Sequence, residues 1–155
     1  MRILLIRPPR RKVPGQPRPA VGLPLGCLYI TAALEDAGQE VSLFDCQILT
    51  DQFPSWKWGA REMFGAPWSQ LEREILKVSP DVVGISNQFT VQVDNAIEVA
   101  RMVKGVNSDI VTVVGGNHAS VLPMDFFQAS SCIDIVCMDE GEHKLSSIVC
   151  CLKGQ

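Results

Sequence analysis

The sequence has neither a surplus of positive charge nor a long hydrophobic run. Its 155 residues include 14 Lys and Arg against 17 Asp and Glu, a formal net charge of −3, whereas a nucleic-acid-binding domain normally carries a basic surplus. The opening apolar run, residues 3–6, is too short for a membrane span or for the core of a signal peptide. We therefore expect a cytoplasmic protein that has no nucleic-acid or membrane partner.

The cysteines lack the spacings that indicate a disulfide framework or a metal site. No two are separated by two residues, the CxxxCxxC triplet is missing, and the neighbours Cys150 and Cys151 cannot be bridged without strain. We expect reduced thiols with structural roles, the usual state in the cytosol, and we assign no metal ligand and no catalytic residue. The six cysteines are Cys27, Cys46, Cys132, Cys137, Cys150 and Cys151.

Short apolar runs alternate with helical patterns along the chain. A length of 155 residues with 46% hydrophobic and 20% charged residues suits one globular domain. Strands are predicted at residues 2–6, 41–45, 82–86, 110–115 and 133–138. Helices are predicted at residues 24–37, 67–78, 91–106, 124–128 and 142–152. This order predicts an α/β fold, a doubly wound, flavodoxin-like or Rossmann-like parallel sheet of five strands with helices on both faces.

Some helix details also follow from the pattern. Thr90 is expected to cap the third helix, and Gly38 to end the first. We expect the apolar stripe of the first helix to comprise Leu25, Leu28, Tyr29, Ala32 and Ala33.

Two long stretches, residues 8–23 and 46–66, are predicted to be irregular. The first contains five prolines: Pro8, Pro9, Pro14, Pro17 and Pro19. Trp56 and Trp58 lie in the second stretch, close in sequence to Trp68. These tryptophans are interpreted either as a local apolar lid on the sheet or as a docking surface.

Polar residues and glycines follow the predicted strands at the edge where open parallel sheets bind ligands. Ser86 ends the third strand, where its hydroxyl can bind a ligand or cap a helix. Gly115 and Gly116 end the fourth strand, where they permit positive φ and close approach of a ligand, or form a plain turn. Residues 139–142, Asp-Glu-Gly-Glu, follow the fifth strand and also suit the first turn of a helix.

Taken in order, these motifs resemble a known family. A Ser after the third strand and a Gly-Gly after the fourth, with 28 residues between Ser86 and Gly115, are similar to the cobalamin-binding fold of methionine-synthase type. The chain also resembles the N-terminal domain of cobalamin-dependent radical S-adenosylmethionine (SAM) enzymes. The matching segments are residues 3–9 (ILLIRPP), 23–35 (LPLGCLYITAALE), 80–86 (PDVVGIS), 115–118 (GGNH) and 140–142, the end of a Gly-Glu-Gly-Glu signature in which Asp139 replaces the first Gly.

The resemblance implies a set of cofactor-binding residues. Ser86 would meet the dimethylbenzimidazole tail, Gly115 and Gly116 would give it room, and Pro8, Pro9, Gln88 and His118 would lie near the lower face of the corrin. The full implied set is Pro8, Pro9, Ser86, Gln88, Val114, Gly115, Gly116, His118, Glu140 and Gly141. A basic group either reaches the phosphate or propionamides or forms a solvated loop; its members are Arg7, Arg10, Arg11, Lys12 and Arg18.

The sequence departs from the family patterns at positions that concern cobalt ligation and the iron–sulfur cluster. The loop after the first strand has no Asp-x-His-x-x-Gly motif, whose His ligates cobalt, and Gln88 replaces a Leu. Neither histidine, His118 or His143, is expected to coordinate cobalt, and His143 is expected to face outward. Because CxxxCxxC is missing, the resemblance implies that residues 1–155 form one cobalamin-binding domain of a methyltransferase-type parent protein. The [4Fe–4S] cluster and SAM would then belong to a radical SAM domain in cis, and this chain alone would have no turnover.

Other classes fit the same fold. A phosphoacceptor receiver needs acids after the first strand and an Asp ending the third, where this chain has Arg7 and Ser86. A flavodoxin-like flavin carrier needs a phosphate-binding loop after the first strand, where this chain is rich in Pro and Arg. A non-catalytic interaction domain that has lost its cofactor is the remaining alternative.

Overall fold

The structure, a computed structural model, describes residues 1–13, 15 and 20–154 and contains a parallel sheet of five strands. The strand order is β3-β1-β6-β7-β8, and all neighbours run parallel. The bounds are β1 (Arg2–Arg7), β3 (Glu40–Asp45), β6 (Val82–Ser86), β7 (Val111–Gly115) and β8 (Ile135–Cys137). This is the flavodoxin-like order, so the predicted fold class is confirmed.

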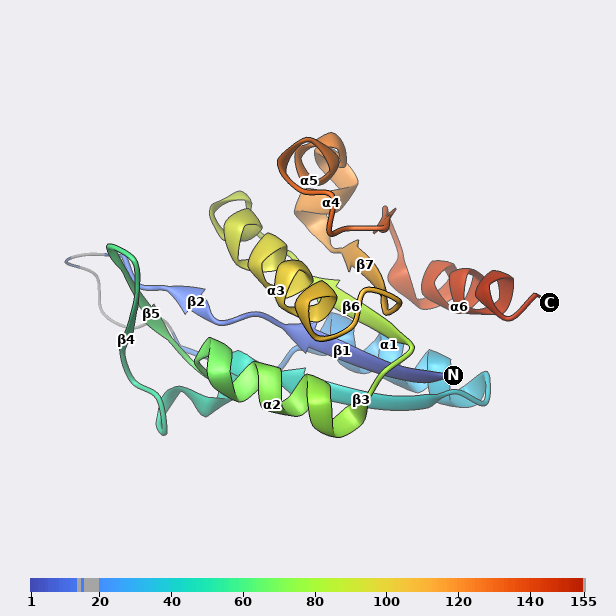
Figure 1. Ribbon diagram of the computed structural model, residues 1–155, viewed down its shortest axis with the longest axis horizontal. Coiled ribbons are helices and arrows are strands. Elements are labelled where there is room, and N and C mark those ends of the chain that lie inside the picture. The colour runs from blue at the N-terminus through green and yellow to red at the C-terminus, as the bar shows by residue number, and fades with distance from the viewer. Residues whose placement is uncertain (14, 16–19, 155) are drawn as a thin grey trace.

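Helices cover both faces of the sheet (Figure 1). One face carries α1 (Leu25–Asp36) and α6 (Gly141–Leu152), and the other carries α2 (Trp68–Val78) and α3 (Val93–Val106). The short helices α4 (Asn117–Val121) and α5 (Met124–Ala129) follow β7. Two 3-10 turns complete the structure: η1 (Cys46–Thr50) follows β3, and η2 (Thr90–Gln92) precedes α3. The predicted strands and helices agree with these bounds to within two residues, whereas α4 was not predicted.

The core is divided by the sheet into two layers, because successive side chains of a strand point to opposite faces. On the side of α2 and α3, the strands contribute Leu4, Ile6, Val83, Ile85 and Val114. On the side of α1 and α6, they contribute Ile3, Leu5, Val82, Val113 and Cys137, which meet Leu34, Leu145 and Val149 of the two helices.

A second, antiparallel sheet lies beyond the carboxyl ends of the parallel strands (Figure 1). It has the order β2-β5-β4, with β2 (Arg10–Arg11), β5 (Arg61–Phe64) and β4 (Trp56–Trp58). The prediction that both stretches are wholly irregular was therefore wrong. Trp68 packs edge-on against Trp56 and Trp58, with ring centroids 5.5 and 5.3 Å apart, so the tryptophans form a local apolar cluster.

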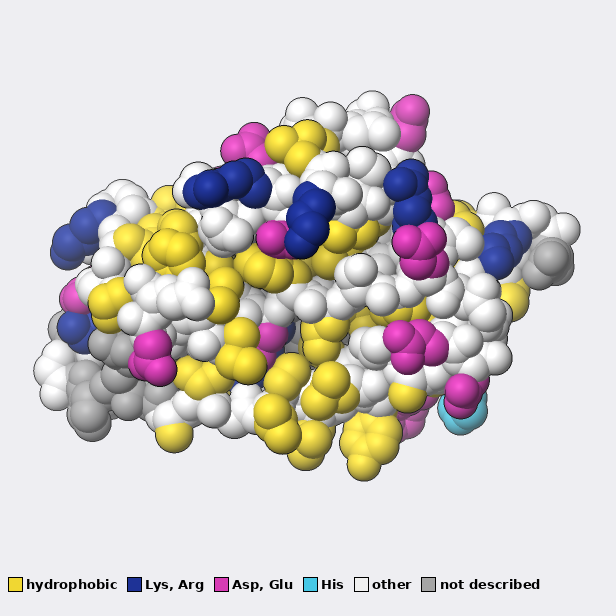
Figure 2. Space-filling model, turned by 90° about the horizontal axis from the view of Figure 1, so that it is seen from below, with side chains coloured by type: hydrophobic (Ala, Val, Ile, Leu, Met, Phe, Trp, Pro, Cys, Tyr) yellow, Lys and Arg dark blue, Asp and Glu magenta, His cyan; other side chains and the backbone are white. Residues whose placement is uncertain are grey.

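The exposed face of α1 differs from the prediction. Cys27 and Leu34 are buried, whereas Leu25 and Tyr29 of the predicted stripe are 58% and 65% exposed. Both faces of this helix are apolar, so the periodicity alone did not indicate which face packs on the sheet. Figure 2 shows further hydrophobic side chains open to solvent on the side seen from below.

Thr90 does not cap α3. The helix begins after Gln92 without a side-chain cap, and the Thr90 hydroxyl instead lies 3.1 Å from His118 Nδ1. All six cysteines are free. Within the described ranges, no helix combines the length and the apolar character needed to cross a membrane.

Candidate functional site

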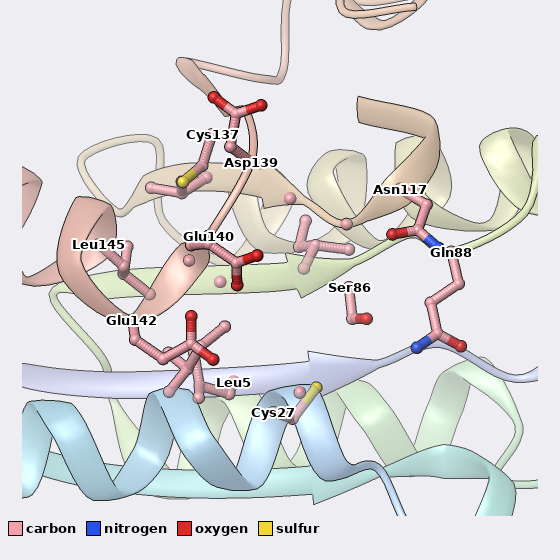
Figure 3. Close-up of a pocket in the computed structure, with 18 residues that line it drawn as sticks. Leu5, Cys27, Ser86, Gln88, Asn117, Cys137, Asp139, Glu140, Glu142 and Leu145 are labelled. Carbon is pink, nitrogen blue, oxygen red and sulfur yellow. The ribbon is translucent and has the colours of Figure 1, made fainter. Parts of the chain in front are cut away.

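A cavity of about 190 Å³ opens at the carboxyl edge of the parallel sheet, on the side of α1 and α6 (Figure 3). Its walls come from the ends of four strands, from both helices and from the loops after β6, β7 and β8. Of the predicted site residues, the cavity brings together Ser86, Gln88, Gly115, Gly116, Glu140 and Gly141. The apolar floor is formed by Leu5, Ile30, Val113 and Leu145.

Two glycines that sequence reasoning did not single out for space keep this cavity open. A Cβ atom on Gly84, in the middle of β6, would lie 2.6 Å from Leu5 Cδ2. A Cβ atom on Gly141 would lie 2.7 Å from Ile30 Cδ1. Side chains at either position would push apolar groups into the cavity, so the glycines shape a cradle between sheet and helices. A glycine inside a strand often marks a place where another group approaches the backbone closely. Gly84 was therefore a signal for this cavity that the sequence contained.

The Gly115–Gly116 pair behaves differently at its two positions. Gly116 has φ +113°, and a Cβ atom there would collide with the backbone carbonyl of Asn87. Gly115 does not have a positive φ, and an added Cβ atom would make ordinary contact, at 3.5 Å, with the Cys137 carbonyl oxygen. Positive φ is therefore used at Gly116 only, whereas Gly115 contributes open space on the cavity side of β7.

A hydroxyl and a thiol face each other across the cavity between β6 and α1. Burial raises the pKa of the Cys27 thiol, and a hydrogen bond with the Ser86 hydroxyl opposes this shift in part. Burial also raises the pKa of Cys137, on the β8 wall. These thiols are therefore protonated at neutral pH, and this part of the wall is polar but uncharged.

Three acids line the opposite rim, and within the described part of the chain only Asp139 is paired with a cation. Asp139, at φ +60°, forms an ion pair of 2.6 Å with Lys144. Glu140 occupies the N-cap position of α6 without a side-chain capping bond, and Glu142 lies in the first helical turn. Figure 3 shows both glutamate carboxylates turned toward the cavity. Among the described residues, no side chain forms an ion pair with Glu140 or Glu142, in contrast to Asp139.

Four predicted residues do not line the cavity. Val114 points into the core on the α3 side of the sheet. Pro8 and Pro9 are buried at the end of β1, where their carbonyl oxygens accept hydrogen bonds of 2.9 Å from the side-chain amides of Gln47 and Asn95. These amides fix the Pro-Pro segment at the carboxyl edge of the sheet.

His118 is the fourth of these residues. It is buried in α4, with Nδ1 3.1 Å from the Thr90 hydroxyl. Its Nε2 lies 3.2 Å from a carboxylate oxygen of Asp125, within ion-pair distance but without hydrogen-bond geometry. The ring packs edge-on against Phe126. His143 is exposed on α6, as predicted.

Most of the described basic residues at the end of β1 and just after it interact with other groups of the chain. Arg7 pairs with Asp45 at 2.9 Å, and Lys12 pairs with Glu62 at 2.9 Å. The Arg10 guanidinium lies 5.9 Å from the ring centroids of both Phe64 and Phe89. Arg11 is exposed, and Arg18, Pro14, Pro17 and Pro19 lie outside the described residues.

The fold is a doubly wound domain, and its cavity lies at the carboxyl edge of the sheet, where domains of this class bind ligands. The B12 binding domain family matches residues 12–149. The chain belongs to this family, and the family match supports cobalamin binding.

The chain is also similar to part of several larger proteins. The chain is 28% identical over 149 residues to an uncharacterized methyltransferase of Pyrococcus horikoshii, covering 96% of this chain and 29% of the relative. It is 33% identical over 132 residues to the cytidylyl-2-hydroxyethylphosphonate methyltransferase of Streptomyces wedmorensis, covering 80% and 23%. An anaerobic magnesium-protoporphyrin IX monomethyl ester cyclase of Rubrivivax gelatinosus is 31% identical over 80 residues, covering 52% and 14%. The chain therefore spans less than a third of the length of these relatives.

Proposed function

We propose that this chain is the cobalamin-binding domain of a radical SAM methyltransferase, in which a separate domain in cis carries the [4Fe–4S] cluster and SAM. The observation that carries the proposal is the cavity beside Ser86 and Gly115, at the edge where this family's motifs are expected to hold a cofactor. The names of two relatives as methyltransferases support the reaction class. When bound, cobalamin supplies a cobalt centre that carries a methyl group.

The nucleotide tail of the cofactor fits the cavity by chemistry and by shape. The apolar floor suits the faces of a flat heterocycle, and the spaces beside Gly84, Gly115 and Gly141 give a planar group room between sheet and helices. Ser86 and the Cys27 thiol offer hydrogen bonds at one wall. In this proposal Gln88, Pro8 and Pro9 support the lower face of the corrin at the cavity mouth, and residues 1–155 act as a single carrier domain.

A binding experiment tests the proposal. Purified chain is incubated with hydroxocobalamin or with flavin mononucleotide, separated from free ligand by gel filtration, and examined by visible absorption. We expect stoichiometric cobalamin with the spectrum of the form in which the nucleotide base has left the metal, and no flavin. Retention of flavin instead would indicate an electron carrier, and retention of neither ligand would indicate an interaction domain; both results would refute the proposal.

A further inference from the structure

The thiol of α1 and the hydroxyl of β6 that face each other in the cavity share one hydrogen bond. Cys27 lies in the first turn of α1 and is only 8% exposed, and Ser86 is the last residue of β6. Both line the cavity, from facing elements (Figure 3). The Cys27 thiol forms a hydrogen bond with the Ser86 hydroxyl, and among the described residues no other hydrogen bond to that hydroxyl is found. The thiol is therefore the group that can orient the hydroxyl.

A second thiol in the cavity wall provides the internal contrast. Cys137 lines the same cavity from the end of β8 and is 7% exposed. Burial and the charges of nearby side chains act on this thiol, and it has no hydroxyl partner among the described residues. A free thiol that only packs behaves as a small hydrophobic group, which is a sufficient role for Cys137. Cys27 has a polar contact that packing does not require.

The pair of Cys27 and Ser86 has two hydrogen atoms to donate. Burial raises the pKa of Cys27, so its thiol keeps its hydrogen at neutral pH. A hydroxyl has one donor and two lone pairs, and a thiol is a weak donor and a weak acceptor. In one arrangement the hydroxyl donates to the sulfur. In the other, the thiol donates to Ser86 Oγ and leaves the hydroxyl hydrogen free to point into the cavity.

The occupant of the cavity decides between these two arrangements. A nucleotide base that has left the metal presents a ring nitrogen with a free lone pair, which can only accept a hydrogen bond. The nitrogen, the hydroxyl and the thiol are all satisfied when the thiol donates to Ser86 Oγ and the hydroxyl donates to the nitrogen. Hydrogen bonds in such a chain polarise one another, so the thiol strengthens the bond to the base.

We infer that Cys27 is a positioning residue that acts through Ser86, because its thiol turns the hydroxyl hydrogen toward a ring nitrogen of the nucleotide base. The inference rests on the proposed function, since it concerns the tail in the same cavity. It gives Cys27 a part in holding the nucleotide and none in holding the corrin ring. Loss of the thiol should therefore weaken the binding only of corrinoids that carry a nucleotide, and only while Ser86 is present.

Equilibrium dialysis of the full chain tests this inference with cobalamin and with cobinamide, which has no nucleotide. The variants are Cys27→Ala, which removes the donor, and Cys27→Ser, which keeps one, each with and without Ser86→Ala. Cys137→Ala in the same two backgrounds is the matched control, because it removes a thiol from the same cavity and leaves the pair intact. Alanine favours a helix, so α1 should tolerate it; circular dichroism and urea denaturation establish that each variant is folded.

For Cys27→Ala we expect cobalamin to bind about threefold to tenfold more weakly, the size of one neutral hydrogen bond. Cobinamide should bind as it does to the wild type, and Cys27→Ser should restore the affinity for cobalamin. In the Ser86→Ala background, Cys27→Ala should have no further effect. Any effect of Cys137→Ala should be the same in both backgrounds, because it is independent of Ser86.

Unchanged cobalamin affinity in Cys27→Ala would overturn the inference. An equal loss for cobinamide, no recovery in Cys27→Ser, or the same loss with and without Ser86 would overturn it as well, since each would show that Cys27 acts by packing alone. Failure of the wild-type chain to bind either corrinoid would instead refute the proposed function.

Discussion

At the scale of single residues, the two adjacent glycines at the end of β7 have different roles, since one leaves space in the cavity and the other permits an unusual backbone conformation. Gly115 lies on the cavity face, where an added Cβ atom meets only ordinary contacts, whereas Gly116 has a left-handed φ and abuts the Asn87 backbone. The same type of substitution should therefore have different effects at the two positions.

Gly115→Val should abolish cobalamin binding and leave the fold intact. The branched side chain would occupy the cavity, while the strand backbone already has an allowed conformation for it. The measurements are the dissociation constant by dialysis and the urea midpoint, which should stay near that of wild type. Gly105→Val is the control, because Gly105 lies in α3 with open space around it. Wild-type affinity in Gly115→Val would mean that the tail does not enter this cavity.

Gly116→Ala completes this comparison. Because a left-handed backbone and a collision with Asn87 both oppose a side chain, the free energy of unfolding should fall by about 1–3 kcal/mol. Unchanged stability would contradict the assigned backbone conformation. We therefore expect a valine to spare the fold at Gly115 but not at Gly116.

No histidine of this chain is expected to ligate cobalt. His118 is buried, contacts Thr90 and Asp125 through its two ring nitrogens, and is not part of the cavity wall. Electron paramagnetic resonance of the Co(II)-loaded chain should show the same spectrum for wild type and His118→Ala. Nitrogen superhyperfine splitting that is present in wild type and lost in the variant would identify His118 as a ligand.

At the scale of elements, one carboxylate joins the beginnings of β7 and β8 to α3. Asp134 accepts hydrogen bonds from the Thr112 backbone and hydroxyl at 2.7 and 2.9 Å, and it pairs with Lys104 at 2.6 Å. Burial opposes its ionisation, but the Lys104 and Thr112 hydrogen bonds outweigh it, so the pKa of Asp134 is lowered.

Asp134→Asn should destabilise the fold at pH 7 by about 1 kcal/mol, a modest value because the side chain is 37% exposed. A carboxyl whose pKa is lowered on folding stabilises the protein above its ordinary pKa of 3.8, and this stabilisation disappears as pH falls through the folded value. The difference between wild type and variant in urea denaturation should therefore persist at pH 5 and shrink below pH 3.8. A difference independent of pH would show that the charge contributes nothing.

The parallel sheet could be predicted from the sequence because its strands are apolar on both faces, as at residues 82–86. Ser86 and Gly115 could be predicted to lie near each other because parallel strands end at one edge. Which face of α1 packs on the sheet could not be predicted, since the exposed Leu25 and Leu28 are as apolar as the buried Cys27 and Leu34. Ile30 and Leu145 both line the cavity only because the helices that carry them pack together in the fold. The contact between Thr90 and His118 likewise joins residues far apart in the sequence, so no local pattern predicts it.

At the scale of the whole molecule, the chain should fold and bind cobalamin by itself without cleaving SAM. It has a complete sheet with helices on both faces but no CxxxCxxC triplet for an iron–sulfur cluster. Chain treated with iron, sulfide and reductant should yield neither methionine nor 5′-deoxyadenosine from SAM, as measured by liquid chromatography. Formation of either product above a protein-free control would contradict this prediction.

The division of the core by the sheet has a consequence for local unfolding. The cavity lies in the layer beneath α1 and α6, and none of its lining residues belongs to α2 or α3. Before ligand is bound, amide hydrogens of α1 and α6 should exchange with solvent faster than those of α3, because opening their side breaks fewer buried contacts. A corrinoid filling the cavity should slow exchange selectively in α1 and α6, by a factor that grows with ligand concentration over its dissociation constant. The empty domain would thus admit a bulky tail by loosening one helical layer while the other keeps the sheet in register.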